Sequence, residues 1–384
     1  MTDKNCVLHN RVEGGCDKTE LSKMLHPECY IDDNWFQREL KSIHFSAWHF
    51  TCLSTAIPNV GSFVSRRFLG RSVIVVRSTD GIIRAFLNTC RHRGAPLTSK
   101  RCGENAHFRC PFHKWSYDTF GSLTSAPGLS GSVRRSDLKS LGLNLVPVQC
   151  EVSAGLVFIN LDEKNEMPLE TYLGSYIEKV ALPHRTQQMH CVQEKSYTLM
   201  TNWKLYIEVD METLHTDFVH SRSIGRQPVR PVEHDSNWFG VYHQNSLSPA
   251  LFPEKRNLAF PSPSSVIGEA AEGTHFCVIL PGFFIVTAPE VMWWIQKTPI
   301  SATRTNVNVG YAFHGETLSR QDFNEIAPHY FERLDQVILE DDRICEYQQE
   351  GLSNRVRGHF TPVEPVAAYF SELIEKLVLG AGHE

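Results

Sequence analysis

Several features that would assign the chain to a large functional class are absent from its 384 residues. Lysine and arginine total 38 against 43 for aspartate and glutamate, so the formal net charge is −5. No long basic run offsets this balance, which argues against a nucleic-acid-binding surface. The N-terminus lacks the apolar core of a secretory signal, and we therefore expect a cytoplasmic protein.

A membrane-spanning segment is also missing. The apolar stretch from Phe276 to Trp294 is interrupted by two prolines, a glycine and Glu290. A spanning helix needs about 20 consecutive, predominantly apolar residues. The stretch instead predicts buried strands joined by turns, and we expect no membrane partner.

A disulfide framework is not expected, although the chain contains 11 cysteines, because disulfides are rare in the cytoplasm. Only Cys90 and Cys110 occur in patterns with histidine. We interpret the other nine as small buried side chains or surface thiols: Cys6, Cys16, Cys29, Cys52, Cys102, Cys150, Cys191, Cys277 and Cys345.

Two loops each combine a cysteine with a histidine. Cys90-x-His92 and Cys110-x-x-His113 supply two thiolates and two imidazoles. A structural zinc site accepts the same ligand set, but zinc fingers do not use a C-x-H half-site followed by Arg-Gly. In a Rieske [2Fe–2S] cluster the cysteines hold one iron and the histidines hold the other. The spacing therefore predicts a Rieske cluster.

The surrounding sequence predicts an α+β protein whose N-terminal part is all-β. Two strands are expected on either side of the turn at Asp80-Gly81. We assign residues 45–160 to the Rieske domain and residues 161–384, where helical and strand patterns alternate, to a second domain. Residues 1–44 are expected to form a helical segment that packs on the second domain.

An electron-carrying cluster explains only part of this length, and a second metal site is indicated by two histidines. His215 and His220 stand five residues apart, which separates them by about 140° on an ideal helix. Both can face one metal only where the helix is distorted or ends between them. Glu212, three residues before His215, is expected on the same face as that histidine.

The third ligand is predicted from helical phase in the segment from Tyr330 to Leu352. Asp341 fills a gap in the apolar stripe between Ile338 and Cys345, so its carboxylate is expected on the buried face. Asp342 and Glu340 each lie about 100° away from that face. Two histidines and one carboxylate form the triad that binds non-haem Fe(II) and leaves coordination positions open.

Five motifs, taken together and in this order, resemble the α-subunit family of Rieske non-haem iron oxygenases, the ring-hydroxylating oxygenases. They are C-x-H-R-G (90–94), C-P-x-H-x-W (110–115), N-W-K (202–204), E-x-x-H-x-x-x-x-H (212–220) and E-D-x-x-x-C-E (340–346). The resemblance covers nearly the whole chain.

The resemblance implies a Rieske domain followed by a helix-grip (START-like) domain that holds mononuclear Fe(II). It also implies a homotrimer in which electrons cross between neighbouring subunits. The family's bridging carboxylate corresponds to Glu212, which would link His215 to the partner subunit's His113.

The sequence departs from the usual family pattern at four positions. Glu212 replaces the more common aspartate, which is reminiscent of oxygenases that act on carnitine-like quaternary amines. Val209 stands where asparagine is common, Leu214 where tyrosine usually precedes the histidine, and Lys114 where glycine is usual. These departures leave the metal ligands in place and leave the substrate open.

Several aromatic residues are candidates for the substrate pocket, where they could surround a quaternary ammonium group or stack on an aromatic acid. The alternative for each is an ordinary place in the core of a sheet. These residues are Phe218, Phe283, Phe284, Trp293 and Trp294.

The chain contains no glycine-rich nicotinamide fingerprint and no plant-type ferredoxin cysteine run. Electrons from NAD(P)H are therefore expected to arrive through a separate reductase, directly or through a ferredoxin. We predict a terminal oxygenase that uses O₂ to hydroxylate or oxidatively demethylate a methylated amine or an aromatic acid. The alternatives are a Rieske electron-transfer or redox-sensing protein with a ligand-binding domain, and a zinc-stabilised binding module.

Overall fold

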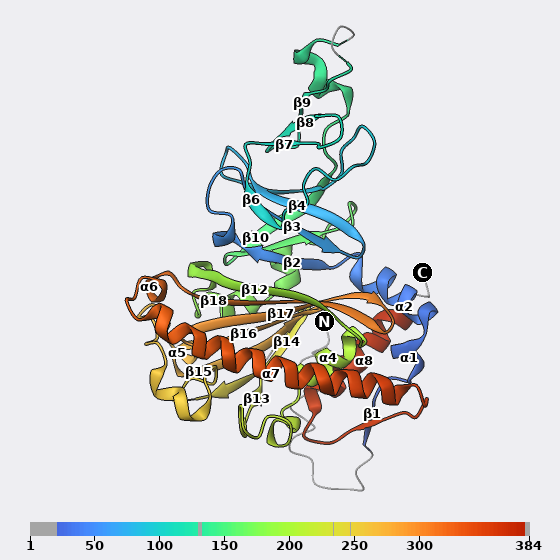
Figure 1. Ribbon diagram of the computed structural model, residues 1–384. Coiled ribbons are helices and arrows are strands. Elements are labelled where there is room, and N and C mark those ends of the chain that lie inside the picture. The colour runs from blue at the N-terminus through green and yellow to red at the C-terminus, as the bar shows by residue number, and fades with distance from the viewer. Residues whose placement is uncertain (1–20, 130–132, 233, 246, 381–384) are drawn as a thin grey trace, which may run out of the picture.

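The computed structural model describes residues 21–129, 133–232, 234–245 and 247–380. Figure 1 shows an all-β part at one end and a larger part, in which one long helix lies across a sheet, at the other. The structure therefore agrees with the predicted α+β class.

The all-β part contains two antiparallel sheets. The larger one has the order β2 (Trp48–Leu53), β11 (Leu156–Asn160), β10 (Pro147–Ser153), β5 (Ile83–Leu87), β4 (Arg71–Arg77), β3 (Ser62–Phe68) and β6 (Cys102–Glu104). The smaller one consists of β7 (His107–Arg109), β8 (Ser116–Asp118) and β9 (Leu123–Ser125). The predicted turn joins β4 to β5, where Gly81 adopts a φ of 83° that favours glycine.

The larger part is built on another seven-stranded antiparallel sheet, which we call the second sheet. Its order is β12 (Met189–Leu199), β18 (Arg304–His314), β17 (Val291–Ser301), β16 (Phe283–Thr287), β15 (Gly273–Ile279), β14 (Trp238–Gln244) and β13 (Arg230–Pro231). The apolar stretch from Phe276 to Trp294 forms parts of three of these strands, as predicted. None of the helices in the described ranges is long and apolar enough to cross a membrane.

The helices lie mainly around this second sheet (Figure 1). They are α1 (Glu28–Ile31), α2 (Asp33–Glu39), α3 (Leu169–Leu173), α4 (Trp203–Asp210), α5 (Glu269–Glu272), α6 (Gly315–Leu318), α7 (Phe323–Leu352) and α8 (Pro365–Gly380). Short π-helical segments cover Leu40–His44 and Ile177–Ala181. Short 3₁₀ segments cover Ser54–Ala56, Arg135–Leu141, Thr186–Gln188, His215–Asp217 and Pro253–Leu258. A two-stranded ribbon pairs β1 (Ser22–Lys23) with β19 (His359–Phe360).

Helix α7 packs its predicted stripe against the sheet. Leu334, Ile338, Asp341 and Cys345 are all buried, which confirms the helical phase that placed Asp341 inward. The helix begins at Phe323 and includes the whole segment from Tyr330 to Leu352 in which the stripe was recognised.

The two parts of the molecule share an apolar core. The Phe50 ring from β2 stacks on Phe283 from β16 at 4.1 Å between centroids and meets Trp294 from β17 edge-on at 5.4 Å. Strand β16 is therefore buried on both faces, by the all-β part on one side and by α7 on the other.

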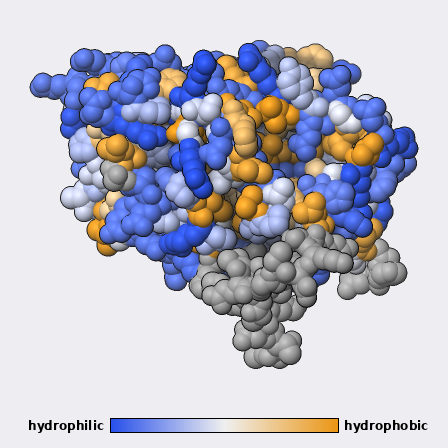
Figure 2. All heavy atoms as spheres, turned by 90° about the horizontal axis from the view of Figure 1, so that it is seen from below, coloured by the Kyte–Doolittle hydropathy of each residue, from blue (hydrophilic) through white to orange (hydrophobic). Residues whose placement is uncertain are grey.

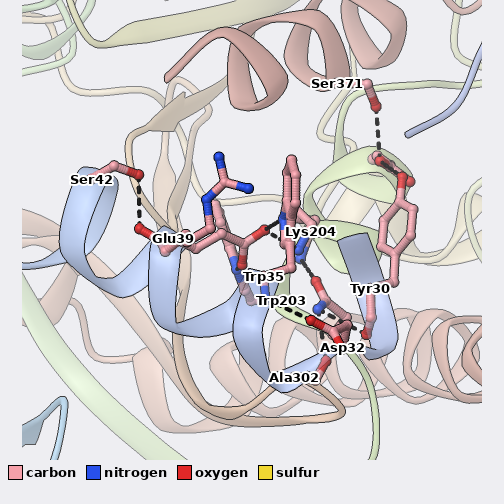
Figure 3. A network of polar contacts seen from close by, with 12 residues as sticks. Tyr30, Asp32, Trp35, Glu39, Ser42, Trp203, Lys204, Ala302 and Ser371 are labelled. Atoms are coloured by element: carbon pink, nitrogen blue, oxygen red, sulfur yellow. Dashed lines mark hydrogen bonds and ion pairs between the residues drawn. The ribbon is translucent and has the colours of Figure 1, made fainter. Parts of the chain in front are cut away.

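Residues 28–44 form helices that pack on the larger part through a buried polar network, shown in Figure 3. Glu39 pairs with Lys204 at 2.5 Å and accepts hydrogen bonds from the indole N–H groups of Trp35 (2.7 Å) and Trp203 (3.0 Å). A buried carboxylate needs such partners to offset the loss of water. The Trp-Lys of the N-W-K motif thus joins α2 to α4.

The cysteines of the described residues are free, as expected. Cys6 and Cys16 lie outside the described residues.

Candidate functional site

The two Cys/His loops have the same backbone structure. In each, the cysteine N–H donates to the carbonyl five residues on, at 2.9 Å for Cys90 and 2.8 Å for Cys110. In each, the cysteine carbonyl accepts from the N–H four residues on, at 3.0 and 3.1 Å. That fourth residue is left-handed in both loops, with φ of 75° at Gly94 and 62° at Lys114. Lysine therefore occupies a conformation that glycine adopts more readily.

The four predicted cluster ligands converge. Cys90 and Cys110 are buried, while His92 is exposed and His113 half-buried. The Nδ1 atoms of the two histidines lie 3.1 Å apart, close to the roughly 3.3 Å expected between two nitrogens that each lie about 2.0 Å from one tetrahedral metal. The two buried thiols and the two more exposed imidazoles thus fit the ligand set of a Rieske [2Fe–2S] cluster, which these four residues would hold.

Tyr117 supports the cluster loop from β8. Its hydroxyl lies 3.5 Å from Cys90 Sγ and accepts a hydrogen bond from the backbone N–H of Arg91 at 3.0 Å. Burial, followed by the contact with the Cys90 sulfur, raises the pKa of Tyr117, so its hydroxyl stays protonated and can donate to a thiolate.

The second predicted site is assembled where α4 has already ended. Helix α4 stops at Asp210, His215 begins a 3₁₀ turn, and His220 follows that turn. His220 Nε2 lies 2.7 Å from Asp341 Oδ1, and His215 Nε2 lies 3.5 Å from the same oxygen. One ligand atom from each of the three residues lies within 4.8 Å of the others. This spacing fits one metal ion bound by two histidines and one carboxylate.

Each histidine is also bonded at its other ring nitrogen, Nδ1, by a glutamate carboxylate. Glu212 bonds the Nδ1 of His215 and also accepts from its backbone N–H at 3.1 Å. Glu340 lies 2.7 Å from the Nδ1 of His220. These contacts fix both rings with Nε2 turned toward Asp341. Burial lowers the pKa of His215, but the hydrogen bond that it donates to Glu212 and the charge of Asp341 raise it more.

A largely apolar cavity opens beside the three ligands. His215, His220 and Asp341 form part of its wall, together with Glu212 and Asp210. Its apolar wall comes from the second sheet and from α7, and includes Phe276, Phe284, Trp293, Ile295, Leu334 and Ile338. Such a cavity can hold a small organic molecule next to a metal.

Comparison with protein families identifies both parts of the chain. The model of the Rieske [2Fe-2S] domain matches residues 47–142. The model of the ring hydroxylating alpha subunit (catalytic domain) matches residues 186–380, just over half of the chain. The chain belongs to the ring-hydroxylating alpha-subunit family. This confirms the resemblance that the five motifs indicated.

Curated relatives of this alpha subunit carry several names. The carnitine monooxygenase oxygenase subunit of Escherichia coli (strain K12) is 26% identical over 352 residues, which cover 89% of this chain and 88% of that protein. The 2-aminobenzenesulfonate 2,3-dioxygenase subunit alpha of Alcaligenes sp is 31% identical over 193 residues. That match covers 50% of this chain and only about half (48%) of the relative.

Solved structures share the fold of this alpha subunit. The quaternary ammonium Rieske monooxygenase CntA, solved with the substrate L-carnitine, superposes with a TM-score of 0.75 at 22% identity. The superposition covers 93% of this chain and 96% of CntA. Naphthalene 1,2-dioxygenase from Rhodococcus sp. gives a TM-score of 0.75 at 18% identity, covering 94% and 95%.

Only two of the five predicted pocket aromatics of this alpha subunit line the cavity. Phe284 and Trp293 do so, but Phe283 and Trp294 point to the opposite face of the sheet, into the core shared with the all-β part. Neighbouring residues of a strand alternate between faces, so one of each pair had to point away. Phe218 is 75% exposed and is not part of the cavity wall. The prediction was wrong for these three residues.

The expectation that Asp342 lies away from the buried face was also wrong. Asp342 is buried, because the side of α7 next to the stripe is covered by β12 and α4, which bring Tyr197 and Tyr206 toward it. Burial raises the pKa of Asp342 to about 6. Glu340 was likewise placed off the stripe, and no sequence signal distinguished it from a surface acid.

A buried ion pair beside the cavity was not predicted. Lys297 from β17 pairs with Asp210, and both side chains are almost fully buried. Burial raises the pKa of Asp210 to about 7, although Lys297 opposes this change. The lysine lies 4.9 Å from the centroid of the Phe284 ring. A cation–π contact thus already occupies a face of one cavity aromatic.

Proposed function

We propose that this chain is the terminal oxygenase of a multicomponent Rieske system. It uses O₂ and electrons from NAD(P)H to hydroxylate or oxidatively demethylate a small organic molecule. The observation that carries the proposal is the His215–His220–Asp341 cluster in the wall of an apolar cavity, within a chain that also has the Cys₂His₂ loops. An electron-transfer protein would not need this second set of ligands.

The ligands proposed for the [2Fe–2S] cluster are Cys90, His92, Cys110 and His113, and those for mononuclear iron are His215, His220 and Asp341. When bound, the cluster supplies one-electron transfer and the mononuclear iron supplies O₂ activation. The chain's own residues bind the substrate, exclude water with the apolar wall, and hold the imidazoles in one orientation.

We further propose a homotrimer in which Glu212 carries electrons from the partner subunit's His113 to His215. Figure 1 supports an exchange between subunits, because the strands β7, β8 and β9 that flank the second Cys/His loop lie at the far end of the molecule from α4 and α7. Glu212 bonds His215 and lines the cavity, and both observations support this role. A separate reductase, directly or through a ferredoxin, completes the system.

Domain boundaries at residues 45–160 and 161–384, with residues 1–44 attached to the second domain, are part of the same proposal; residues 1–20 and 381–384 lie outside the described ranges. The Glu39–Lys204 network supports the attachment. A cytoplasmic location is also proposed. On the face in Figure 2, apolar residues form separate groups among hydrophilic ones, as on a surface that contacts water.

Metal analysis and spectroscopy of the purified protein test the proposal. We expect three irons per chain, a Rieske EPR signal after reduction, and substrate-dependent O₂ uptake with a reductase and NAD(P)H. Two irons per chain and no O₂ uptake would instead support an electron-transfer or redox-sensing protein. A colourless protein that contains zinc would support the binding-module alternative.

A further inference from the structure

The cavity contains a buried cation without a partner. Arg333, on α7, is part of the cavity wall and is only 3% exposed. Its side chain forms no hydrogen bond or ion pair with any residue in the described ranges, and its Nε is fully buried. A buried charge of this kind is costly unless something satisfies it.

The charged groups around Arg333 do not satisfy it. Of the two nearby acids, Asp341 faces both histidines and Glu340 is bonded by His220, Ser223 and Gln336. The remaining titratable neighbours are Arg256, a second cation, and Tyr311, whose hydroxyl donates to Asp335. Metal bound at Asp341 would take up that carboxylate's charge as well.

Arg256 strengthens the positive character of this end of the cavity. Its Nη2 donates to the carbonyl of Ile224, a cavity residue, at 3.2 Å, while its Nε is buried without a partner. Two arginines with unpartnered N–H groups therefore lie near one another. Gln227 adds a buried side-chain oxygen without a partner in the same wall.

We propose that Arg333, assisted by Arg256, binds the carboxylate of a small organic acid, which is the substrate of the oxygenase reaction. The guanidinium group matches a carboxylate because its planar fork can donate two parallel hydrogen bonds. The apolar body of the acid packs against Phe284 and Trp293. This inference deepens the proposed function and rests on it for the oxidation itself.

The positions on α7 constrain the shape of the substrate. Arg333 precedes Asp341 by eight residues, so their backbone positions lie about 12 Å apart along the helix axis. We place the carboxylate on the Arg333 side of the cavity and the carbon that reacts on the side of His215 and Asp341. An acid whose apolar body separates the two groups fits this arrangement.

A simple ammonium substrate does not fit. Such a cation would meet the unpaired charge of Arg333, and one face of Phe284 is already occupied by Lys297, which is paired with Asp210. Of the two substrate classes expected from the sequence, the cavity favours the acid. A methylated amine is compatible only if the same molecule also carries a carboxylate.

Equilibrium binding to the iron-loaded protein without O₂ tests the inference. The probes are substituted benzoates and phenylacetates, their amides, and benzyltrimethylammonium. Their binding is measured by ligand-observed NMR. We expect carboxylates to bind at least about 10-fold more tightly than the matching amides, since hydrogen bonds to charged groups contribute about that much. Equal binding of acid and amide, preferential binding of the ammonium probe, or no carboxylate binding overturns the inference without any variant.

Variants then assign the preference to Arg333. Arg333→Gln should weaken carboxylate binding about 10- to 100-fold and change amide binding little. Arg333→Lys should keep part of the preference, because it keeps the charge but not the fork. Arg343→Gln, an exposed position on the same helix, is the matched control and should bind like the wild type. Unchanged carboxylate binding in Arg333→Gln would mean that the iron, not the arginine, holds the acid.

Iron content and O₂ uptake are measured on the same preparations. Loss of oxygenase activity with intact carboxylate selectivity would contradict the proposed function and leave the anion site in place. Normal O₂ uptake with no selectivity for acids would contradict the anion site alone.

Discussion

Neighbouring carboxylates on α7 have different surroundings, and their substitution should separate metal binding from stability. Asp341→Ala should remove the mononuclear iron and all turnover while the Rieske EPR signal stays, because it deletes a ligand. Asp342→Asn should keep all three irons, since Asp342 faces Tyr197 and Tyr206 rather than the histidines. Iron analysis of both variants checks this. Loss of the mononuclear iron from Asp342→Asn, together with its retention in Asp341→Ala, would show that Asp342 and not Asp341 is the ligand.

Glu212 should control electron delivery rather than metal binding. Glu212→Gln keeps the shape of the side chain and much of its hydrogen bonding to His215 but loses its charge. We expect all three irons to remain and turnover to fall by orders of magnitude. In single-turnover experiments on pre-reduced protein, the rate of cluster oxidation after addition of substrate and O₂ should also fall by orders of magnitude.

The same experiment has a control at Glu340, which holds the other histidine but does not line the cavity. Glu340→Gln should likewise keep all three irons, because the amide oxygen can still accept from the Nδ1 of His220, yet its cluster should be oxidised at the normal rate. Near-normal cluster oxidation in Glu212→Gln would leave Glu212 as a positioning residue only.

Individual ligands were predictable from sequence because spacing and helical phase both restrict them. The Cys/His spacing and the gap in the stripe of α7 identified residues that the structure brings together. Arg333 could not be found in this way. It stands next to Leu334 in an amphipathic helix and has the sequence signature of a surface arginine; only the cavity around it makes it a buried cation.

At the scale of elements, helix α4 joins the N-terminal segment to α8 through Glu208, which accepts hydrogen bonds from Tyr30 (2.6 Å) and Ser371 (3.0 Å). Burial raises the pKa of Glu208 from 4.5 to about 7, although both hydrogen bonds oppose the change. The folded state thus keeps a proton that the unfolded chain releases above about pH 4.5. The free energy of unfolding should therefore fall as the pH rises from about 4.5 to 7, by about 3 kcal/mol from this group.

Glu208→Gln should abolish that pH dependence, because the amide stays neutral and still accepts from Tyr30. Chemical denaturation between pH 5 and 8 should give a flatter curve than the wild type, with the variant more stable at pH 8. Glu375→Gln, an exposed position on α8, should follow the wild-type curve. A Glu208→Gln curve as steep as that of the wild type would assign the pH dependence to other groups.

Elements with strong local signals were predicted, whereas orientation within one strand was not. The turn at Gly81 and the stripe of α7 are local patterns, and both were found. Strand β16, with the sequence FFIVT, is buried on both faces and therefore has no alternation of apolar and polar residues. Nothing in it indicates that Phe284 rather than Phe283 faces the cavity. That choice depends on the contact with Phe50, which is distant in sequence.

At the scale of the whole molecule, the proposed electron route requires two chains, and two inactive variants should therefore complement each other. Cys110→Ser lacks the cluster but keeps the mononuclear site, and Asp341→Ala has the reverse defect. Neither should turn over alone. If each interface of a ring-shaped trimer passes electrons from one chain to the next, it is productive only when an Asp341→Ala chain donates to a Cys110→Ser chain.

Co-expression of the two variants in equal amounts makes that pairing occur at random at about one interface in four, so about a quarter of wild-type turnover should return. Separately purified variants, mixed without subunit exchange, should stay inactive and serve as the control. Electron transfer within one chain predicts no recovery in any mixture, since no chain then holds both metal centres. Adding Glu212→Gln to the Cys110→Ser chain should abolish the recovered activity, whereas the same substitution on the Asp341→Ala chain should not. This asymmetry follows because only the accepting chain's Glu212 lies between the partner subunit's His113 and a working His215.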